Sequence, residues 1–251
     1  MRGLWKIIRN LFFPPKCACC RELLPAVEES YGAGSCLCKK CYTAWNRAKE
    51  ESCPECLCAS HKCLCAPSTR GFKRSGLPKL LTYTPNKNNT QNKIIYSLKK
   101  VNDKRICEFV ASELSLSMGA WFKDRALLPD ECIYTYVPRR AVAVAELGFD
   151  QGRRLSREVC RIFEGRLENV FVRRGGKEQK QLDKSSRARN VDRSLRLRRR
   201  AAKVIKGKRV VIIDDLVTTG ATLDRAMRLI KRNGAKEVYV ACVARTCEIK
   251  K

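Results

Sequence analysis

Near the carboxyl end of the chain, apolar residues follow a strand–helix–strand pattern. Four apolar β-branched residues in a row, Val210 to Ile213, predict a strand buried on both faces, as in a parallel sheet. The run stops at two adjacent carboxylates. A helix is predicted from about Ala221 to the stop signal Asn233-Gly234, and its apolar face consists of Leu223, Ala226, Met227 and Ile230. A second strand, Glu237 to Ala244, follows. Ligands of such sheets bind beyond the carboxyl ends of the strands, where the two carboxylates lie.

The middle of the chain adds further helices and another strand. Apolar residues at helical spacing extend over Gln91 to Trp121, with a break at Asn102-Asp103. Cys132 to Val137 predicts a strand, which is followed by the turn Pro138-Arg139-Arg140. Arg154 to Phe163 predicts one more helix. Strands that alternate with helices predict an α/β fold, a doubly wound parallel sheet with helices on both faces, from about residue 80 onward.

The segment after the two carboxylates has the composition of a phosphate-binding loop. Small residues let backbone N–H groups converge, and the helix that opens at about Ala221 adds its unpaired amides and its dipole. Three hydroxyls can donate to the same phosphate, those of Thr218, Thr219 and Thr222. Asp214 and Asp215 would repel a phosphate, so we expect them to face a sugar diol, and the two ends together fit a ribose 5-phosphate. The alternative is a plain strand–helix–strand unit whose acidic pair is solvated.

Cysteine spacing predicts a second, smaller module. Of 16 cysteines, eleven lie between Cys17 and Cys65. Two C-x2-C pairs separated by seventeen residues have the spacing of a zinc ribbon, with ligands Cys17, Cys20, Cys38 and Cys41. A second zinc site is predicted with a less regular last pair, from Cys53, Cys56, Cys63 and Cys65. The surplus residues are Cys19, Cys36, Cys58 and the lone histidine His61, which is an alternative ligand.

The same cysteines are also able to pair as disulfides. The chain shows no export signal, so a reducing, cytoplasmic compartment is expected, where paired cysteine knuckles favour structural zinc. The apolar run within Met1–Pro15 is too short and too interrupted to span a membrane. We expect a short amphipathic helix there that packs on the protein, without stable membrane insertion; binding to a membrane surface is the alternative.

The length of 251 residues accommodates one domain with a substantial core and a smaller module. We predict that residues 1–67 contain the short N-terminal helix and the zinc-ribbon module. Residues 68–79, rich in Gly, Pro, Ser and Lys, are the predicted linker, and residues 80–251 the predicted α/β domain.

Ile212 to Thr222 resembles the phosphoribosyl-pyrophosphate (PRPP) binding motif of type I phosphoribosyltransferases, an apolar run followed by two acidic residues and a turn rich in threonine and glycine. The resemblance implies that Asp214 and Asp215 hold the ribose hydroxyls. It implies that the 5-phosphate is wrapped by Leu216, Val217, Thr218, Thr219, Gly220, Ala221 and Thr222. The turn of Pro138, Arg139 and Arg140 would bind the pyrophosphate, and Mg²⁺ would accompany PRPP.

The chain is strongly basic, with 53 Lys and Arg against 25 Asp and Glu and a formal net charge of +28. This balance favours polyanionic partners, nucleic acid or phosphate-bearing ligands, unless it only maintains solubility. In the phosphoribosyltransferase fold, the basic segment Arg173–Arg209 would supply a strand beside the PRPP site and a mobile loop that closes over the substrate. The alternatives are a track for single-stranded nucleic acid, for which stacking aromatics are scarce, and a solvated charged loop.

A wider resemblance is to the ComF/GntX family, competence-type proteins. It rests on the Pro-Arg turn, on Leu147 to Gly152 where Asp150 replaces the usual Asn, on the double cysteine knuckles, and on Gln179, Leu182, Arg187 and Asn190-Val191. The Cys63-x-Cys65 pair departs from the family pattern. Membership implies PRPP binding and a role in DNA uptake and transformation.

The same membership leaves two functions open. The first is transfer of a phosphoribosyl group to a nitrogen acceptor, for which the sequence indicates no general base. The alternative is a non-catalytic competence or scaffold protein that binds zinc and single-stranded DNA, with PRPP as a regulatory or vestigial ligand.

Overall fold

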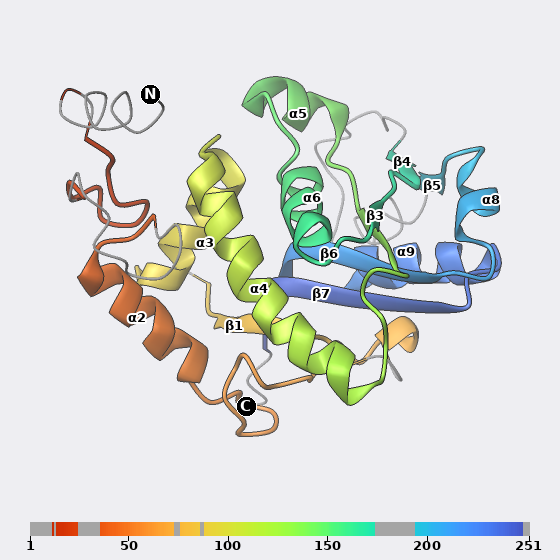
Figure 1. The fold of residues 1–251 in the computed structure, drawn as a ribbon, viewed down its shortest axis with the longest axis horizontal. Helices are drawn as coiled ribbons and strands as arrows, with labels where there is room; N and C mark the ends of the chain where they lie inside the picture. The colour runs from red at the N-terminus through yellow and green to blue at the C-terminus, as the bar shows by residue number, and fades with distance from the viewer. Residues whose placement is uncertain are drawn as a thin grey trace, which may run out of the picture.

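A computed structural model describes residues 12, 14–24, 36–72, 76–85, 88–173 and 194–247. Its centre is a five-stranded sheet in which neighbouring strands pair in parallel. The order across the sheet is β1 (Lys79–Tyr83), β7 (Glu237–Thr246), β6 (Arg209–Val217), β2 (Ile133–Tyr136) and β3 (Arg166–Leu167). Helices cover both faces of this sheet, which confirms the predicted α/β class (Figure 1).

The strand β6 lies in the middle of the sheet and is buried from both sides. Successive strand residues point to opposite faces, so Val211 and Ile213 enter one hydrophobic core while Val210 and Ile212 enter the other. The sequence predicted that this strand stops at the carboxylates, which was wrong: it continues to Val217. The extension follows from pairing with β7, which continues to Val217↔Arg245. Backbone pairing therefore overrides the change from apolar to charged side chains.

Three long helices form one layer beside the sheet. They are α3 (Thr90–Lys100), α4 (Lys104–Asp124) and α6 (Gln151–Ile162), close to the ranges that the apolar spacing predicts. The predicted break at Asn102-Asp103 is present, because the Asp103 carboxylate caps α4 by accepting from the Arg105 amide at 2.9 Å.

The opposite face is covered by one helix of similar length and by several shorter elements. They are α9 (Ala221–Arg232), α8 (Ala201–Ile205), the single helical turn η1 (Arg70–Phe72), and an antiparallel pair of β4 (Phe171–Arg173) with β5 (Leu195–Leu197). A short helix, α5 (Ala141–Leu147), follows β2 and buries none of its residues. Of the basic segment Arg173–Arg209, residues 174–193 lie outside the described residues, and with them Gln179, Leu182, Arg187 and Asn190-Val191.

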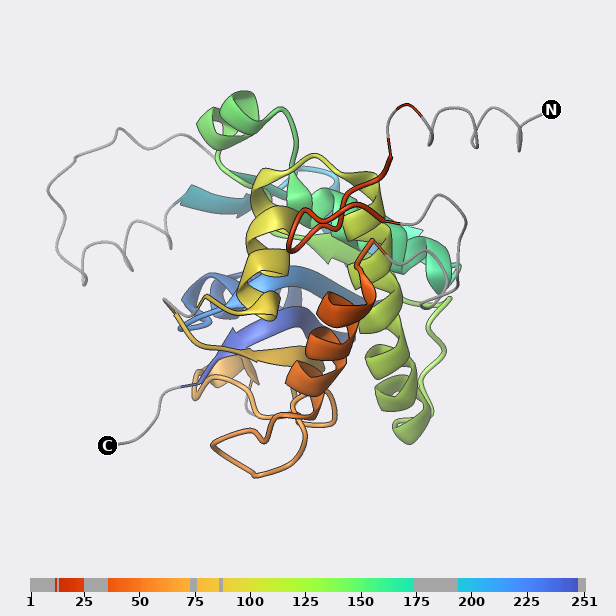
Figure 2. The same ribbon diagram turned by 90° about the vertical axis from the view of Figure 1, so that its left-hand side faces the viewer.

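The helix of the cysteine-rich part, α2 (Lys39–Glu50), shares its core with the sheet domain (Figure 2). Trp45 is completely buried, with its ring centroid 5.6 Å from that of Phe109 on α4. Its indole Nε1 donates to Glu113 at 3.0 Å, and Lys49 pairs with the same carboxylate. The predicted linker also contributes buried side chains, Phe72 and Leu77. The boundaries 1–67, 68–79 and 80–251 stay predictions, but the hydrophobic core is continuous across them.

The amino-terminal segment was predicted to be a short helix over Met1–Pro15. Apart from Phe12, Pro14 and Pro15, this segment lies outside the described residues. Within the described part of the chain, no helix combines the length and the apolar character needed to cross a membrane.

The shared core predicts that the cysteine-rich part and the sheet domain unfold together. Trp45→Ala should destabilise the whole protein by about 3–5 kcal/mol, because it opens a cavity between α2 and α4. Circular dichroism during chemical denaturation should show one transition at a lower midpoint. Leu116→Ala is the control, since Leu116 is 71% exposed on α4 and should cost little. A second, early transition in the Trp45 variant with an unchanged main transition would contradict the shared core.

Candidate functional site

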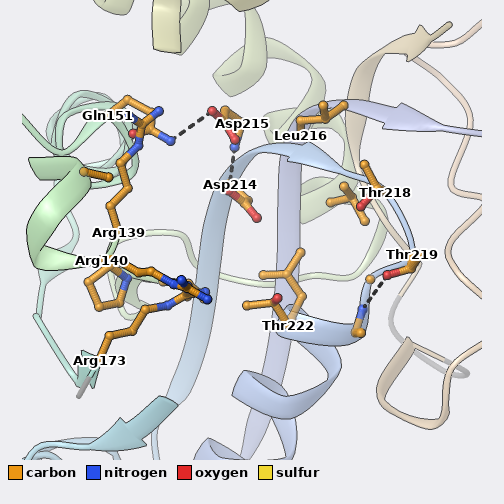
Figure 3. Close-up of a pocket in the computed structure, with 17 residues that line it drawn as sticks. Arg139, Arg140, Gln151, Arg173, Asp214, Asp215, Leu216, Thr218, Thr219 and Thr222 are labelled. Carbon is orange, nitrogen blue, oxygen red and sulfur yellow. Dashed lines mark hydrogen bonds between the residues drawn. The ribbon is translucent and has the colours of Figure 1, made fainter. Parts of the chain in front are cut away.

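A pocket of about 360 Å³ opens at the carboxyl ends of β2 and β6. It is lined by residues 137–140 after β2, by residues 214–223 at the end of β6 and the start of α9, and by Ala143, Gln151 and Arg173 (Figure 3). The twelve residues predicted for PRPP therefore come together in one pocket: Pro138, Arg139, Arg140, Asp214, Asp215, Leu216, Val217, Thr218, Thr219, Gly220, Ala221 and Thr222. Their contact with a ligand stays a prediction.

The two carboxylates differ because β6 continues through them. Adjacent strand residues point to opposite faces, so Asp215 turns toward α3 and α6 while Asp214 does not. Asp215 is only 5% exposed, and its Oδ2 accepts from Gln151 Nε2 at 3.1 Å and lies 3.8 Å from Lys99 Nζ. The Asp215 amide in turn donates to Asp214 Oδ1 at 2.9 Å. Asp215 is thus fixed by neighbours.

The electrostatics of the pair favour a ligand. Burial and the nearby charge of Asp215 raise the pKa of Asp214 well above its ordinary value. Two crowded, desolvated carboxylates are stabilised by hydroxyl donors or by a cation. Oxygen atoms of this kind are also what Mg²⁺ prefers, so the pair fits Mg²⁺ that arrives with phosphate oxygens.

The turn after β2 is tied to the start of α6 by Asp150. Its Oδ2 accepts from the Arg139 amide at 3.0 Å, and its Oδ1 accepts from the Arg153 amide at 3.1 Å. Both oxygens therefore accept from backbone N–H groups. Asparagine, the residue usual in the family pattern, has only one acceptor oxygen, so the carboxylate suits this double role.

The guanidinium groups of the arginines at the pocket lie in different places. The Arg139 guanidinium is bound to α3, where its Nη2 donates to the Lys99 carbonyl at 3.2 Å. Arg140 and Arg173 instead point toward each other inside the pocket (Figure 3). Burial and the charge of Arg140 lower the pKa of Arg173. Two cations held together in this way are suited to bind an anion, and they lie opposite the threonine-rich turn.

The threonine-rich turn depends on Gly220. This residue caps α9 with φ +73°, in the left-handed region that glycine adopts without strain. A side chain there would also collide with Pro67, since its Cβ would lie 2.7 Å from the proline Cγ. Thr219 Oγ1 accepts from the Ala221 amide at 3.4 Å. Because first-turn amides of a helix have no partner four residues back, the turn is suited to an anion.

The structure assembles both predicted cysteine clusters. One holds Cys17, Cys20, Cys38 and Cys41 and the other Cys53, Cys56, Cys63 and Cys65, and within each the sulfur atoms all lie within 4.8 Å of one another. Tetrahedral zinc with Zn–S bonds of about 2.3 Å requires sulfurs about 3.8 Å apart. The pairs Cys20–Cys38 at 3.6 Å and Cys56–Cys63 at 3.4 Å are close to this spacing. Both sulfur sets therefore fit zinc.

The first C-x2-C knuckle of each cluster has the same backbone hydrogen bond and the same left-handed residue. The Cys17 amide donates to Glu22 O and the Cys53 amide to Cys58 O, both at 2.8 Å. The residue after the second cysteine of each knuckle, Arg21 or Leu57, has a positive φ. The irregular Cys63-x-Cys65 pair thus completes a cluster whose other pair, Cys53-x2-Cys56, has the same backbone pattern as Cys17-x2-Cys20.

The surplus residues lie outside these two groups of four. Cys36 is fully buried, and burial raises the pKa of its thiol to about 12, so it packs as an apolar residue. The exposed Cys58 and the partly exposed Cys19 also lie outside the groups. His61 does too, and its Nδ1 lies 3.0 Å from the Lys49 carbonyl instead. His61 is therefore not one of the clustered ligands.

Sequence reasoning missed three residues of the pocket region. In the sequence, Gln151 falls within a segment of family resemblance and Arg173 within a basic stretch, and no pattern singles out Lys99. A strand pattern at Val170–Arg173 was the available signal for Arg173. Nothing local marks Lys99, because its place beside Asp215 follows from the packing of α3 on the sheet.

Substitution of Gly220 tests the turn. Gly220→Ala should destabilise the protein by about 1–2 kcal/mol from the left-handed conformation alone, and further through the contact with Pro67. Gly119→Ala is a matched control, because a Cβ at that position in α4 meets nothing within 4 Å. That change should stabilise the protein by about 0.5–1 kcal/mol. Equal effects in urea denaturation would refute the assigned conformation.

The raised pKa of Asp214 predicts a pH-dependent stability. The pKa of Asp214 is higher in the folded protein than in the unfolded chain. Below about pH 4 the carboxyl is protonated in both states and does not change the free energy of unfolding. As pH rises through the folded-state pKa, the buried carboxyl has to ionise, and this destabilises the fold. Asp214→Asn should therefore have a higher Tm than the wild type at neutral pH, and the difference should vanish in acid. The exposed Asp130→Asn is the control. A difference in Tm between the variant and the wild type that grows as pH falls would contradict the raised pKa.

Comparisons with known proteins agree with this geometry. The phosphoribosyl transferase domain family matches residues 141–249. DNA utilization protein YhgH of Escherichia coli O6:H1 is 29% identical over 242 residues, covering 94% of this chain and 99% of the relative. Competence protein ComFC of Streptococcus pneumoniae is 27% identical over 218 residues, covering 84% and 88%.

Among solved structures, a hypoxanthine phosphoribosyltransferase from Staphylococcus aureus aligns with a TM-score of 0.35 and 12% identity, over 59% of this chain and 70% of that one. The YhgH relative covers 94% of this chain, which includes the part that holds the two cysteine clusters. Residues 141–249 thus match the phosphoribosyl transferase domain family, and the chain is similar over most of its length to a DNA utilization protein and a competence protein.

Proposed function

We propose that this protein binds PRPP together with Mg²⁺ in the pocket at the carboxyl ends of β2 and β6. The single observation that carries the proposal is that two carboxylates, Asp214 and Asp215, and two guanidinium groups, those of Arg140 and Arg173, line one cavity of about 360 Å³. Asp214 and Asp215 accept from the ribose hydroxyls. The 5-phosphate lies on the turn Leu216–Thr222 and the start of α9.

The pyrophosphate then lies against the opposite wall. Arg140 and Arg173 point into the pocket there, and the backbone of the turn 138–140 is held by Asp150. Arg139 serves mainly to fix this turn to α3. Mg²⁺, when bound, neutralises charge on the pyrophosphate oxygens and so makes pyrophosphate a better leaving group.

A transfer reaction is the catalytic form of this proposal. A nitrogen nucleophile would displace pyrophosphate from C1 of the ribose, with the cations of the pocket stabilising the charge that develops on the leaving group. Arg140 and Arg173 supply that charge from the chain itself. The carboxylate pair orients the ribose, so positioning contributes to the rate.

The cellular role that we propose is DNA uptake in natural transformation. The relatives named for DNA utilization and for competence support it, as does the formal net charge of +28. A second candidate is a non-catalytic protein that binds zinc and single-stranded DNA and uses PRPP as a regulatory or vestigial ligand. The two cysteine clusters and the basic composition are the observations that favour this second candidate.

Isothermal titration of the zinc-loaded protein with PRPP and Mg²⁺ tests the first proposal. We expect a micromolar Kd, about 8 kcal/mol of binding free energy, and binding of ribose 5-phosphate weaker by at least about tenfold. The double variant Asp214→Asn/Asp215→Asn should lose PRPP binding, because the ribose hydroxyls lose their charged acceptors. Asp130→Asn, an exposed carboxylate, should bind as the wild type does.

Binding of a single-stranded oligonucleotide to the same variants separates the two candidates. If DNA and PRPP use different surfaces, the double variant keeps its DNA affinity. Loss of both ligands in a folded double variant would refute separate sites. The absence of heat with PRPP in folded, zinc-loaded wild-type protein would refute the PRPP proposal and leave the nucleic-acid role.

A further inference from the structure

The chain that leaves the second cysteine cluster lies directly on the turn of the pocket. Cys65 is followed by Ala66 and Pro67, and the Pro67 ring fills the space where a Cβ of Gly220 would be, at 2.7 and 2.9 Å. The ring of Phe72 closes the same space at 3.2 Å. Residues 66–72 therefore form a support beneath Gly220, which we call the support segment.

The support segment is also attached to the helix that opens at the turn. The Gly71 amide donates to Asp224 Oδ1 at 2.7 Å, and Asp224 lies in the first turn of α9. The other carboxylate oxygen, Oδ2, accepts from Arg228 at 2.9 Å. The start of α9, which we propose to face the 5-phosphate, is thus held from the side of the support segment.

The other end of the support segment is anchored by the second cluster. Lys79 on β1 is completely buried, and its Nζ donates to Cys63 Sγ at 2.9 Å and to the carbonyls of Cys63 and Cys65 at 3.1 and 3.2 Å. An ammonium group at this place would offset part of the negative charge of four thiolates that hold a zinc ion. Within the same knuckle, Glu55 pairs with Arg245 of β7 at 2.8 Å.

These contacts make one continuous path from the cluster to the pocket. The sheet holds the cluster through Lys79 and Arg245, and the cluster leads into Pro67. Structural zinc supplies much of the folding free energy of such loops, so without a metal ion the contacts of Lys79 and Arg245 alone would hold the four cysteines less firmly together. The support segment would then lose its fixed starting point, and Gly220 its contact.

We propose that a metal ion at Cys53, Cys56, Cys63 and Cys65 positions the phosphate-binding turn through Pro67, so that metal binding and PRPP binding strengthen each other. The inference rests on the proposed PRPP site and adds a regulation to it. Pro67 and Lys79 are positioning residues, since neither lines the pocket. Coupling between two sites is reciprocal. Zinc should therefore raise the affinity of the protein for PRPP, and PRPP should raise the affinity of this cluster for zinc by the same factor.

The test compares two serine substitutions in the same knuckle of the full chain. Cys56→Ser removes an exposed ligand of the cluster, whereas Cys58→Ser removes an exposed cysteine outside it. Zinc content and PRPP affinity are measured on both, by mass spectrometry and by titration. We expect Cys58→Ser to keep both zinc ions and the wild-type Kd, and Cys56→Ser to lose one zinc and bind PRPP about tenfold more weakly.

A third variant tests the path. Pro67→Ala leaves every cysteine in place, so it should keep both zinc ions and still bind PRPP several-fold more weakly. The coupling would be overturned if Cys56→Ser and Pro67→Ala both bound PRPP with a Kd within about twofold of that of Cys58→Ser. An unchanged zinc content in Cys56→Ser would overturn it as well.

Hydrogen exchange keeps this test independent of PRPP itself. If the wild-type protein binds no PRPP, the proposed function fails, but the amides of residues 216–222 still report on the support. They should exchange faster in Cys56→Ser than in Cys58→Ser. Equal exchange in the two variants would overturn the mechanical link, and if Cys56→Ser does not fold, Pro67→Ala against the wild type gives the same comparison.

Discussion

Parallel pairing of β6 on both of its edges is the constraint on which the site depends. The strand is bonded to β2 on one side and to β7 on the other, and its apolar residues are buried on both faces. Pairing with β7 keeps the backbone extended as far as Val217. Two carboxylates are thereby carried into the sheet and turned to opposite faces, at the edge where parallel sheets bind their ligands.

This arrangement has a cost in stability. Asp215 is buried beside Gln151 and Lys99, but Asp214 remains crowded by its neighbour and its pKa is raised. Charged groups with few partners in the free protein are a common feature of functional sites, because the ligand completes their interactions. The paired cations Arg140 and Arg173 on the other wall show the same pattern with the opposite sign.

The cysteine-rich part is structurally continuous with the domain that carries the pocket. Trp45 of α2 lies in the same core as Phe109 of α4, and Ser97 of α3 donates to the Ala18 carbonyl beside the first cluster at 3.2 Å. The second cluster contacts β1 and β7 through Lys79 and Arg245. Both clusters therefore pack against helices and strands of the sheet domain, which a separate module on a linker would not do.

The sequence by itself determined the elements and the chemistry that are local in the chain. The apolar run of β6, the face of α9, the threonine-rich turn and the cysteine spacings all specify their structure within a few residues. Only the tertiary structure decided that β6 passes through the carboxylates, that Arg173 faces Arg140, and that Pro67 supports Gly220. Each of these depends on contacts between residues far apart in the chain, and such contacts leave no periodic pattern in the sequence.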